Sequence, residues 1–291
     1  MTEFSNEEID DQGRCEWLTL TDALKAFVLN EAGHQSQRHI RPLHYYIASR
    51  LVVEGGFHPS EITPHPPFKV IERSGGRKIL EYDPESGSSG ERIVLGGLKT
   101  KKIDVVVSKP HIGPVIAVSM KGSLGAFRNL TNRMEEAIGD CTNLHISYPV
   151  LVYGFFHVIR ATVAGVDVKP NDVCVLPDGT ITDAILRYHD ILTRLEGRKD
   201  LREETTKYEA VCLALVKPDD PGSGTLLPNF PPRESPLALS GFFEKMYRSY
   251  DLRFVFAAPT LSTSTSRMVW DESSPALSNL PAVDYIPRTE G

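Results

Sequence analysis

The spacing of apolar residues along the chain predicts an alternation of helices and strands. Apolar positions three or four residues apart, typical of a helix with one buried face, predict helices at residues 17–32, 42–54, 127–136, 183–195 and 240–250. Shorter apolar runs, some alternating and some continuous, predict strands at residues 68–72, 102–108, 114–121, 148–159, 208–216 and 252–257. From residue 42 to residue 159 the order is helix, three strands, helix, strand. We therefore expect an α/β protein.

Turn and helix-end signals separate these elements. Thr21 is the predicted N-cap of the first helix, and Pro42 stands at the favoured first position of the second helix. Gly55 and Gly56 then terminate this second helix. Loops rich in proline, glycine and serine are predicted at residues 58–67, 86–90 and 217–236. The Ser/Thr/Pro-rich chain after Pro259 is expected either to cover a partner or to be disordered.

The composition is that of a globular protein. Hydrophobic residues make up 41% and their longest runs are strand-sized, so a core is expected and a transmembrane helix is not. No basic and apolar leader follows Met1, and the four cysteines form no CxxC pair, so we expect a cytoplasmic protein with free thiols and no zinc cluster. The net charge of −6 gives no overall attraction to nucleic acid, although a locally basic cleft is compatible with it. His34, His39 and His44 recur every five residues, which does not align them on one helix face, so no histidine metal site is predicted.

One stretch of the chain brings three chemically useful side chains towards one point. Asp104 lies in the predicted strand 102–108, Lys121 ends the next strand, and one of two neighbouring acids, Glu135 or Glu136, follows on the helix. Carboxylate oxygens suit Mg²⁺, and a bound Mg²⁺ polarises a phosphoryl oxygen and lowers the pKa of a water molecule. This arrangement predicts a metal-dependent phosphodiesterase, with Lys121 beside the phosphate or the attacking water. The letters alone are also typical of a half-exposed strand that has no site.

The order of elements over residues 42–159, with Asp104 and Lys121 in their places, resembles the PD-(D/E)xK nuclease superfamily. This resemblance implies a restriction-endonuclease-like fold, with a mixed central β-sheet flanked by helices in the order αβββαβ. It also implies a single nuclease domain over residues 1–291, in which the extension 160–291 serves DNA recognition and dimerisation. The family has an acidic residue two positions before the lysine, and here Ser119 stands at that position.

The Ser-x-Lys form is similar to a subgroup of type II restriction endonucleases. In that subgroup the missing glutamate lies on the following helix, fourteen residues after the lysine, which is Glu135 here. The subgroup also has a glutamate late in the first core helix, a place that Glu54 fills. Its Arg-Ser-Asp-Arg recognition cluster is absent from this chain, so no target sequence is implied.

The apolar stripe of the predicted helix favours Glu135 over Glu136 as the metal ligand. The stripe consists of Phe127, Leu130, Met134, Ala137 and Ile138. At about 100° per residue, Glu135 falls at the edge of this stripe, whereas Glu136 points to solvent with Asn129 and Asp140.

These considerations give a set of predicted site residues. The predicted catalytic residues are Asp104, Lys121, Glu135, Ser119 and Glu54. Asp104 and Glu135 are the predicted metal ligands, and Ser119 is at most a hydrogen-bonding neighbour. Glu54 is equally typical of a surface charge at a helix end.

Polar residues at the start of the same helix are predicted DNA contacts, because arginine suits guanine and asparagine suits adenine in the major groove. They are Arg128, Asn129, Asn132 and Arg133. The alternative is that they form a solvated helix face.

We therefore expect a type II restriction endonuclease that cuts double-stranded DNA with Mg²⁺, for which Mn²⁺ can substitute. A homodimer or higher homo-oligomer is expected, because two symmetric active sites cut both strands most simply. Apolar residues of the helix at 240–250 are predicted to supply part of its interface: Phe242, Phe243, Met246, Tyr247 and Tyr250. Two alternatives remain open: a less specific repair or defence nuclease of the same fold, and an inactive relative that binds nucleic acid or protein.

Overall fold

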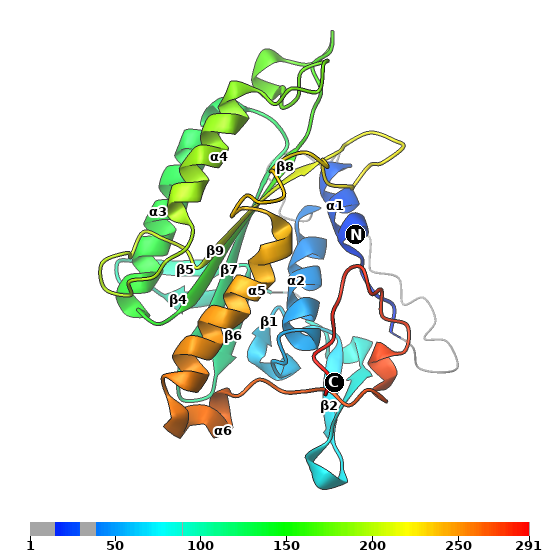
Figure 1. Ribbon diagram of the computed structural model, residues 1–291, viewed down its shortest axis with the longest axis vertical. Helices are drawn as coiled ribbons and strands as arrows, with labels where there is room; N and C mark the ends of the chain where they lie inside the picture. Colours follow the sequence, from blue (N-terminus) through cyan, green and yellow to red (C-terminus); the bar gives the residue numbers. More distant parts are fainter. Residues whose placement is uncertain (1–14, 30–38, 89, 291) are drawn as a thin grey trace.

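The computed structural model of the protein describes residues 15–29, 39–88 and 90–290. They form three layers, in which a central sheet carries helices on both faces (Figure 1). The predicted α/β class with a mixed central sheet is therefore confirmed. No helix within these residues is long and apolar enough to cross a membrane.

Within the described residues the central sheet has five strands in the order β1-β6-β7-β8-β9. They are β1 (Ile62–Thr63), β6 (Val105–Lys109), β7 (Gly113–Ser123), β8 (Val152–Arg160) and β9 (Ala210–Val216). Strand β6 is antiparallel to β1 and β7, whereas β8 is parallel to β7 and β9. The parallel pair β7 and β8 needs a crossover connection, and the helix α3 (Leu130–Ser147) supplies it.

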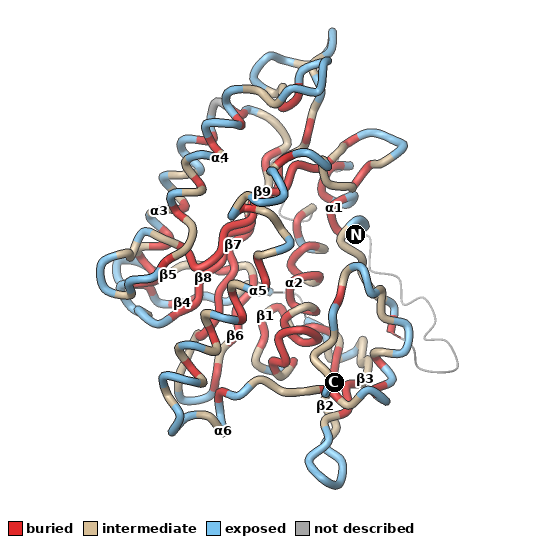
Figure 2. Tube along the Cα trace, in the orientation of Figure 1, coloured by how far each residue is buried: buried red, intermediate tan, exposed pale blue. Residues whose placement is uncertain are grey.

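Each face of the sheet has its own hydrophobic core, because successive residues of a strand point to opposite faces. Val105 and Val107 of β6 pack with α1 (Leu20–Val28), α2 (Arg41–Val53) and α5 (Leu239–Tyr250). Val106 packs on the other side with α3 and with α4 (Asp183–Leu195). The central strands are accordingly buried along their length (Figure 2).

The remaining strands form two small hairpins outside the central sheet. They are β2 (Phe68–Glu72) with β3 (Lys78–Tyr82), and β4 (Arg92–Leu95) with β5 (Thr100–Ile103). The predicted strand at 68–72 exists, but it pairs locally and does not enter the sheet. The first sheet strand is β1, which lies within the predicted loop 58–67.

The ends of some helices were predicted correctly and those of others were not. Helix α4 begins and ends where the sequence predicts. The N-cap of α1 is Thr19, whose side chain accepts a hydrogen bond from the Asp22 N–H, and not Thr21. The predicted strand at 252–257 is wrong, because Asp251–Phe256 continues α5 as a π-helical turn in which Phe254 stacks on Tyr250.

The C-terminal segment lies against the chain's own core, so the prediction that it covers a partner or is disordered is wrong. Trp270 is buried, and its indole Nε1 donates hydrogen bonds to the carbonyl oxygens of Val52 and Val53 at 2.9 and 3.1 Å. The hydroxyl of Tyr285 donates to the carbonyl oxygen of Leu18 at 2.6 Å. The short α6 (Ser262–Thr265) begins this segment.

The aromatic residues of α5 are also part of this core. Phe242, Phe243, Met246, Tyr247 and Tyr250 are all buried within the single chain. They therefore supply no surface for a second copy, and the predicted dimer interface is wrong at this place.

Candidate functional site

Asp104 lies at the junction of β5 and β6, where the chain passes from the β4–β5 hairpin into the central sheet. Its Oδ2 accepts a hydrogen bond from the backbone N–H of Met120 at 2.7 Å, which ties it to the neighbouring strand β7. Its Oδ1 lies 3.7 Å from Nε2 of His44 in α2. The side chain of Asp104 is 16% exposed, so the carboxyl is mostly withdrawn from water.

Burial controls the protonation of this pair. Desolvation raises the pKa of Asp104 to about 6, against the lowering effects of the Met120 N–H and of Lys121. Desolvation, reinforced by Arg41, lowers the pKa of His44 to about 4. Neutral His44 gives Asp104 no compensating positive charge at neutral pH.

His44 is the site residue that the sequence did not indicate. Its Nε2 is buried and has no hydrogen-bond partner among the described residues, and 3.7 Å from a carboxylate oxygen is too long for a hydrogen bond. A buried polar atom without a partner costs free energy, so this atom invites a ligand or a water molecule. The histidine spacing gave no signal, because His44 meets Asp104 only through the tertiary fold. His34 lies outside the described residues.

Lys121 points towards α3, where it meets Glu136. Its Nζ donates to Oε1 of Glu136 at 2.7 Å, and Arg133 donates to Oε2 of the same carboxylate at 3.2 Å. Burial acts to raise the pKa of Glu136, but the hydrogen bonds from Lys121 and Arg133 hold it below its usual value. The side chains of Lys121 and Glu136 are 24% and 38% exposed, so this pair is open to solvent.

The predicted helix phase is therefore wrong: Glu136 faces the sheet and Glu135 is exposed. The predicted stripe left out Asp140, Asn143 and Leu144, which are buried and extend the buried face of α3 towards Glu136. Asp140 was placed with the solvent-facing residues, but it is paired with Lys101.

Ser119 and Glu54 have structural contacts, and among the described residues no hydrogen bond or ion pair joins either of them to Asp104, Lys121 or Glu136. Ser119 is buried, and its hydroxyl shares a 2.6 Å hydrogen bond with the hydroxyl of Tyr153. Glu54 forms two hydrogen bonds with Arg50, at 2.9 and 2.8 Å, and accepts one from the backbone N–H of Ile286 in the C-terminal segment. Ten residues separate Glu54 from His44, about 15 Å along a helix, so Glu54 does not reach Asp104.

The predicted DNA contacts begin α3 beside this cluster. Asn129, Asn132 and Arg133 are exposed. Arg133 also pairs with Glu136, and the side chain of Arg128 lies outside the described part of the structure. Their role in DNA binding stays a prediction.

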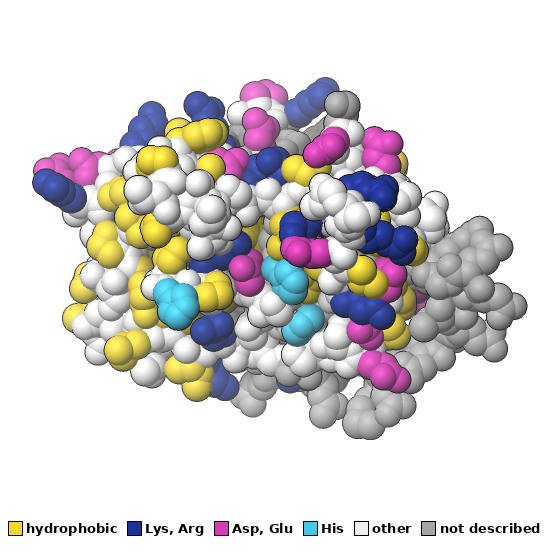
Figure 3. Space-filling model, turned by 90° about the horizontal axis from the view of Figure 1, so that it is seen from below, with side chains coloured by type: hydrophobic (Ala, Val, Ile, Leu, Met, Phe, Trp, Pro, Cys, Tyr) yellow, Lys and Arg dark blue, Asp and Glu magenta, His cyan; other side chains and the backbone are white. Residues whose placement is uncertain are grey.

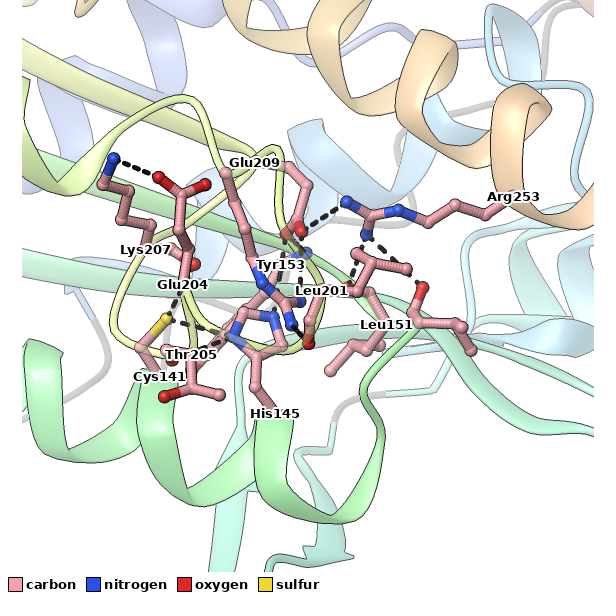
Figure 4. Close-up of polar contacts among 12 residues, drawn as sticks. Cys141, His145, Leu151, Tyr153, Leu201, Glu204, Thr205, Lys207, Glu209 and Arg253 are labelled. Carbon is pink, nitrogen blue, oxygen red and sulfur yellow. Dashed lines mark hydrogen bonds and ion pairs between the residues drawn. The ribbon is translucent and has the colours of Figure 1, made fainter.

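A second charged cluster lies around Glu209, immediately before β9 (Figure 4). Arg253 and Arg198 contact its carboxylate at 2.8 and 3.3 Å, and the backbone N–H of Tyr153 donates to it at 2.6 Å. The side chains of Glu209, Arg198 and His145 are completely buried. Burial raises the pKa of Glu209 and the two arginines oppose this shift. This cluster joins α3, β8, β9 and the end of α5, and no substrate can reach it.

The donor set around Asp104 can be tested for its fit to a metal ion. Among the described residues, no three His, Cys, Asp or Glu side chains are placed to hold a metal ion by themselves. Mg²⁺ is commonly held by one or two carboxylates together with waters and substrate phosphates. Asp104 and Glu136 offer hard oxygen ligands of this kind on adjoining elements.

The candidate site thus consists of Asp104, His44, Lys121 and Glu136, contributed by the β5–β6 junction, α2, β7 and α3. No protein-family model, no curated protein and no solved structure matches the chain.

Proposed function

We propose that the protein is a metal-dependent endonuclease that hydrolyses phosphodiester bonds of double-stranded DNA. The observation that carries this proposal is that Lys121 binds the carboxylate of Glu136 and is also near enough to Asp104 to act against the rise of its pKa. Lys121 binds Glu136 directly, and Asp104 is fixed to the backbone of Met120, the residue before Lys121.

The order of the elements supports a nuclease of the PD-(D/E)xK type. Helix α2 precedes β1, β6 and β7, and the crossover helix α3 then leads to the parallel strand β8. Counted over the central sheet alone, without the hairpins β2–β3 and β4–β5 that lie between β1 and β6 in the chain, this order matches the αβββαβ order that the family resemblance implies. The lysine stands near the end of β7, and the first carboxylate stands at the start of β6.

In this proposal each residue has a defined task. Asp104 and Glu136 would hold Mg²⁺, with Glu136 replacing the predicted Glu135. When bound, the ion would polarise the phosphoryl oxygen and lower the pKa of a water molecule. Lys121 orients the scissile phosphate, and its existing contact with Glu136 keeps its ammonium beside the carboxylate.

Incubation of supercoiled plasmid DNA with the purified protein tests this function. We expect cleavage in Mg²⁺ or Mn²⁺ and none in excess EDTA. Discrete bands would support a site-specific type II restriction endonuclease, and a smear would support a less specific nuclease. Intact plasmid in both metals would overturn the nuclease and favour a relative that only binds DNA or protein.

A further inference from the structure

A cavity of about 350 Å³ opens beside the candidate site. It lies between the first turn of α2 and the β4–β5 hairpin. Its lining includes Arg41, His44, Tyr45, Pro64, Ile93 and Lys102. His44 also approaches Asp104, so the cavity shares one side chain with the site described above.

The charged residues of the lining are Arg41, Lys102 and Glu91, so two positive charges face one negative charge and the balance favours an anion. Arg41 is exposed, and no carboxylate of the described residues pairs with it. Lys102 is 69% exposed, and its Nζ lies 3.8 Å from Glu91, a loose pair that leaves the ammonium open to a further partner. The first turn of α2 contains no acidic residue, and no side chain caps it, so the positive end of the helix dipole adds to the attraction.

The other walls of the cavity are apolar. Pro64 and Ile93 present hydrocarbon surface, Ile93 with 63% of its surface exposed, and Tyr45 adds an aromatic ring. An aromatic or apolar wall beside cationic side chains suits a ligand with a flat ring system and a phosphate group, because bases stack on such surfaces and phosphates bind arginine and lysine. A volume above about 300 Å³ is sufficient for a ligand of this size.

Histidine 44 connects this cavity to the chemistry. The residue lines the cavity, and its buried Nε2, which no other described residue hydrogen-bonds, lies 3.7 Å from Asp104. A DNA strand with one nucleotide in this cavity would therefore have its next phosphate on the side of Asp104 and Lys121. Basic and acidic side chains are interspersed over the lower face of the molecule, without a broad field of one sign (Figure 3). In the absence of such a field, the local attraction of Arg41 and Lys102 for a phosphate can position a DNA strand on this face.

We propose that the cavity is a subsite for a single nucleotide of the DNA strand, adjacent to the phosphate that is cut. Arg41 and Lys102 bind the phosphate of this nucleotide, and its base lies against Tyr45, Pro64 and Ile93. The subsite rests on the proposed nuclease function, and it adds a place where the enzyme holds the strand that it cuts.

Calorimetric titration of the full-length protein tests the subsite without any cleavage. The ligands are the four deoxynucleoside 5′-monophosphates, the matching nucleosides and inorganic phosphate. We expect at least one monophosphate to bind, and its nucleoside and phosphate alone to bind at least about tenfold more weakly, because each provides only half of the contacts. Equal binding of phosphate and monophosphates would reduce the cavity to a simple anion site and overturn the proposal.

Charge reversal identifies the place of binding. Arg41→Glu is expected to weaken monophosphate binding at least about tenfold, through loss of a charge-assisted hydrogen bond. Arg73→Glu, the same change at an exposed residue of the β2–β3 hairpin, should leave binding unchanged. Ile93→Ala should weaken monophosphate binding and leave phosphate binding unchanged. Absence of binding to the parent protein, or equal effects of Arg41→Glu and Arg73→Glu, would overturn the subsite.

The Asp104→Asn variant separates this proposal from the nuclease itself. It should lose cleavage and still bind the monophosphate, because Asp104 lies outside the cavity lining. Plasmid cleavage by the parent protein without nucleotide binding would overturn the subsite and leave the nuclease. Nucleotide binding without plasmid cleavage would overturn the nuclease and leave the cavity as a nucleotide site.

Discussion

The two charged clusters lie towards opposite ends of β7 and β8 and are built in opposite ways. Around Glu209 the carboxylate is completely buried, and two arginines and a backbone N–H compensate its charge. Around Asp104 the carboxyl is partly exposed, its histidine neighbour is neutral, and the nearby lysine is bound to Glu136. The compensated cluster closes a junction between elements. The cluster around Asp104 carries an unfavourable desolvation free energy that the fold does not require, and perturbed groups of this kind are typical of functional sites.

Tyr153 links the Glu209 cluster to β7, because its backbone N–H donates to Glu209 and its hydroxyl shares a hydrogen bond with Ser119. The hydroxyl of Tyr153 is thus held by the strand that carries Lys121. The cluster around Glu209 holds the start of β8. The cluster around Asp104 lies further along β7 and β8, where Lys121 is in register with His157. Substitutions around Glu209 should therefore lower stability, whereas substitutions around Asp104 should mainly lower cleavage.

The largest effect on stability is expected in the buried cluster. Glu209→Ala leaves Arg198 and Arg253 without their carboxylate, and removal of one partner of a buried ion pair costs about 3–5 kcal/mol in the free energy of unfolding. Chemical denaturation measures this loss. The matched control is Glu136→Ala, which removes a half-exposed pair and should cost about 1 kcal/mol or less. Equal losses in the two variants would contradict the comparison.

Asp104→Asn should increase the free energy of unfolding, whereas Glu209→Ala decreases it. The rise of the Asp104 pKa from 3.8 to about 6 means that ionised Asp104 opposes folding at neutral pH, by up to about 3 kcal/mol. The variant should therefore unfold at higher denaturant concentration than the parent protein, while it loses cleavage. A loss of stability would show that Asp104 is compensated as Glu209 is.

The pH dependence follows from the same shift. Below about pH 4 both the folded and unfolded states keep the proton on residue 104. Between about pH 4 and pH 6 only the unfolded state releases it. The stability of the parent protein relative to Asp104→Asn should thus fall as pH rises through this window. Cleavage at limiting Mg²⁺ should increase with pH, because the metal requires the ionised carboxylate and competes with the proton for it.

Ser119→Ala should cause a small loss of stability and have the smallest effect on cleavage. It leaves the buried hydroxyl of Tyr153 without its hydrogen-bond partner, which costs about 1 kcal/mol in stability. Plasmid cleavage should stay near the parental rate, since Ser119 contacts neither Lys121 nor Glu136. A variant of parental stability that cuts much more slowly would place Ser119 in the reaction.

The sequence predicted the sheet better than it predicted its surroundings. Strands β7, β8 and β9 were located because buried parallel strands leave long apolar runs. Strand β1 has two residues and leaves no pattern, so the loop that contains it was predicted as loop throughout. The burial of α5 and of the C-terminal segment depends on contacts such as Trp270 with Val52, which join residues far apart in the chain.

Two members of the candidate site were predictable and two were not. Asp104 and Lys121 follow from strand order and spacing. Glu136 depends on the buried face of α3, which includes the polar residues Asp140 and Asn143 and therefore does not show in the apolar pattern. His44 depends on how α2 packs beside the β5–β6 junction, and no local pattern encodes such a contact.

The central claim is that Lys121 and Glu136 form the working pair beside Asp104. Single-turnover cleavage of supercoiled plasmid in saturating Mg²⁺ tests it most directly, with the parent protein, Lys121→Ala, Glu136→Ala and Glu135→Ala compared at equal concentration. Lys121→Ala and Glu136→Ala should each slow cleavage by about 10²-fold or more, as loss of one charge-stabilising group does in other enzymes, while Glu135→Ala cuts near the parental rate. Parental cleavage by Lys121→Ala, or a slow Glu135→Ala beside a fast Glu136→Ala, would contradict the account.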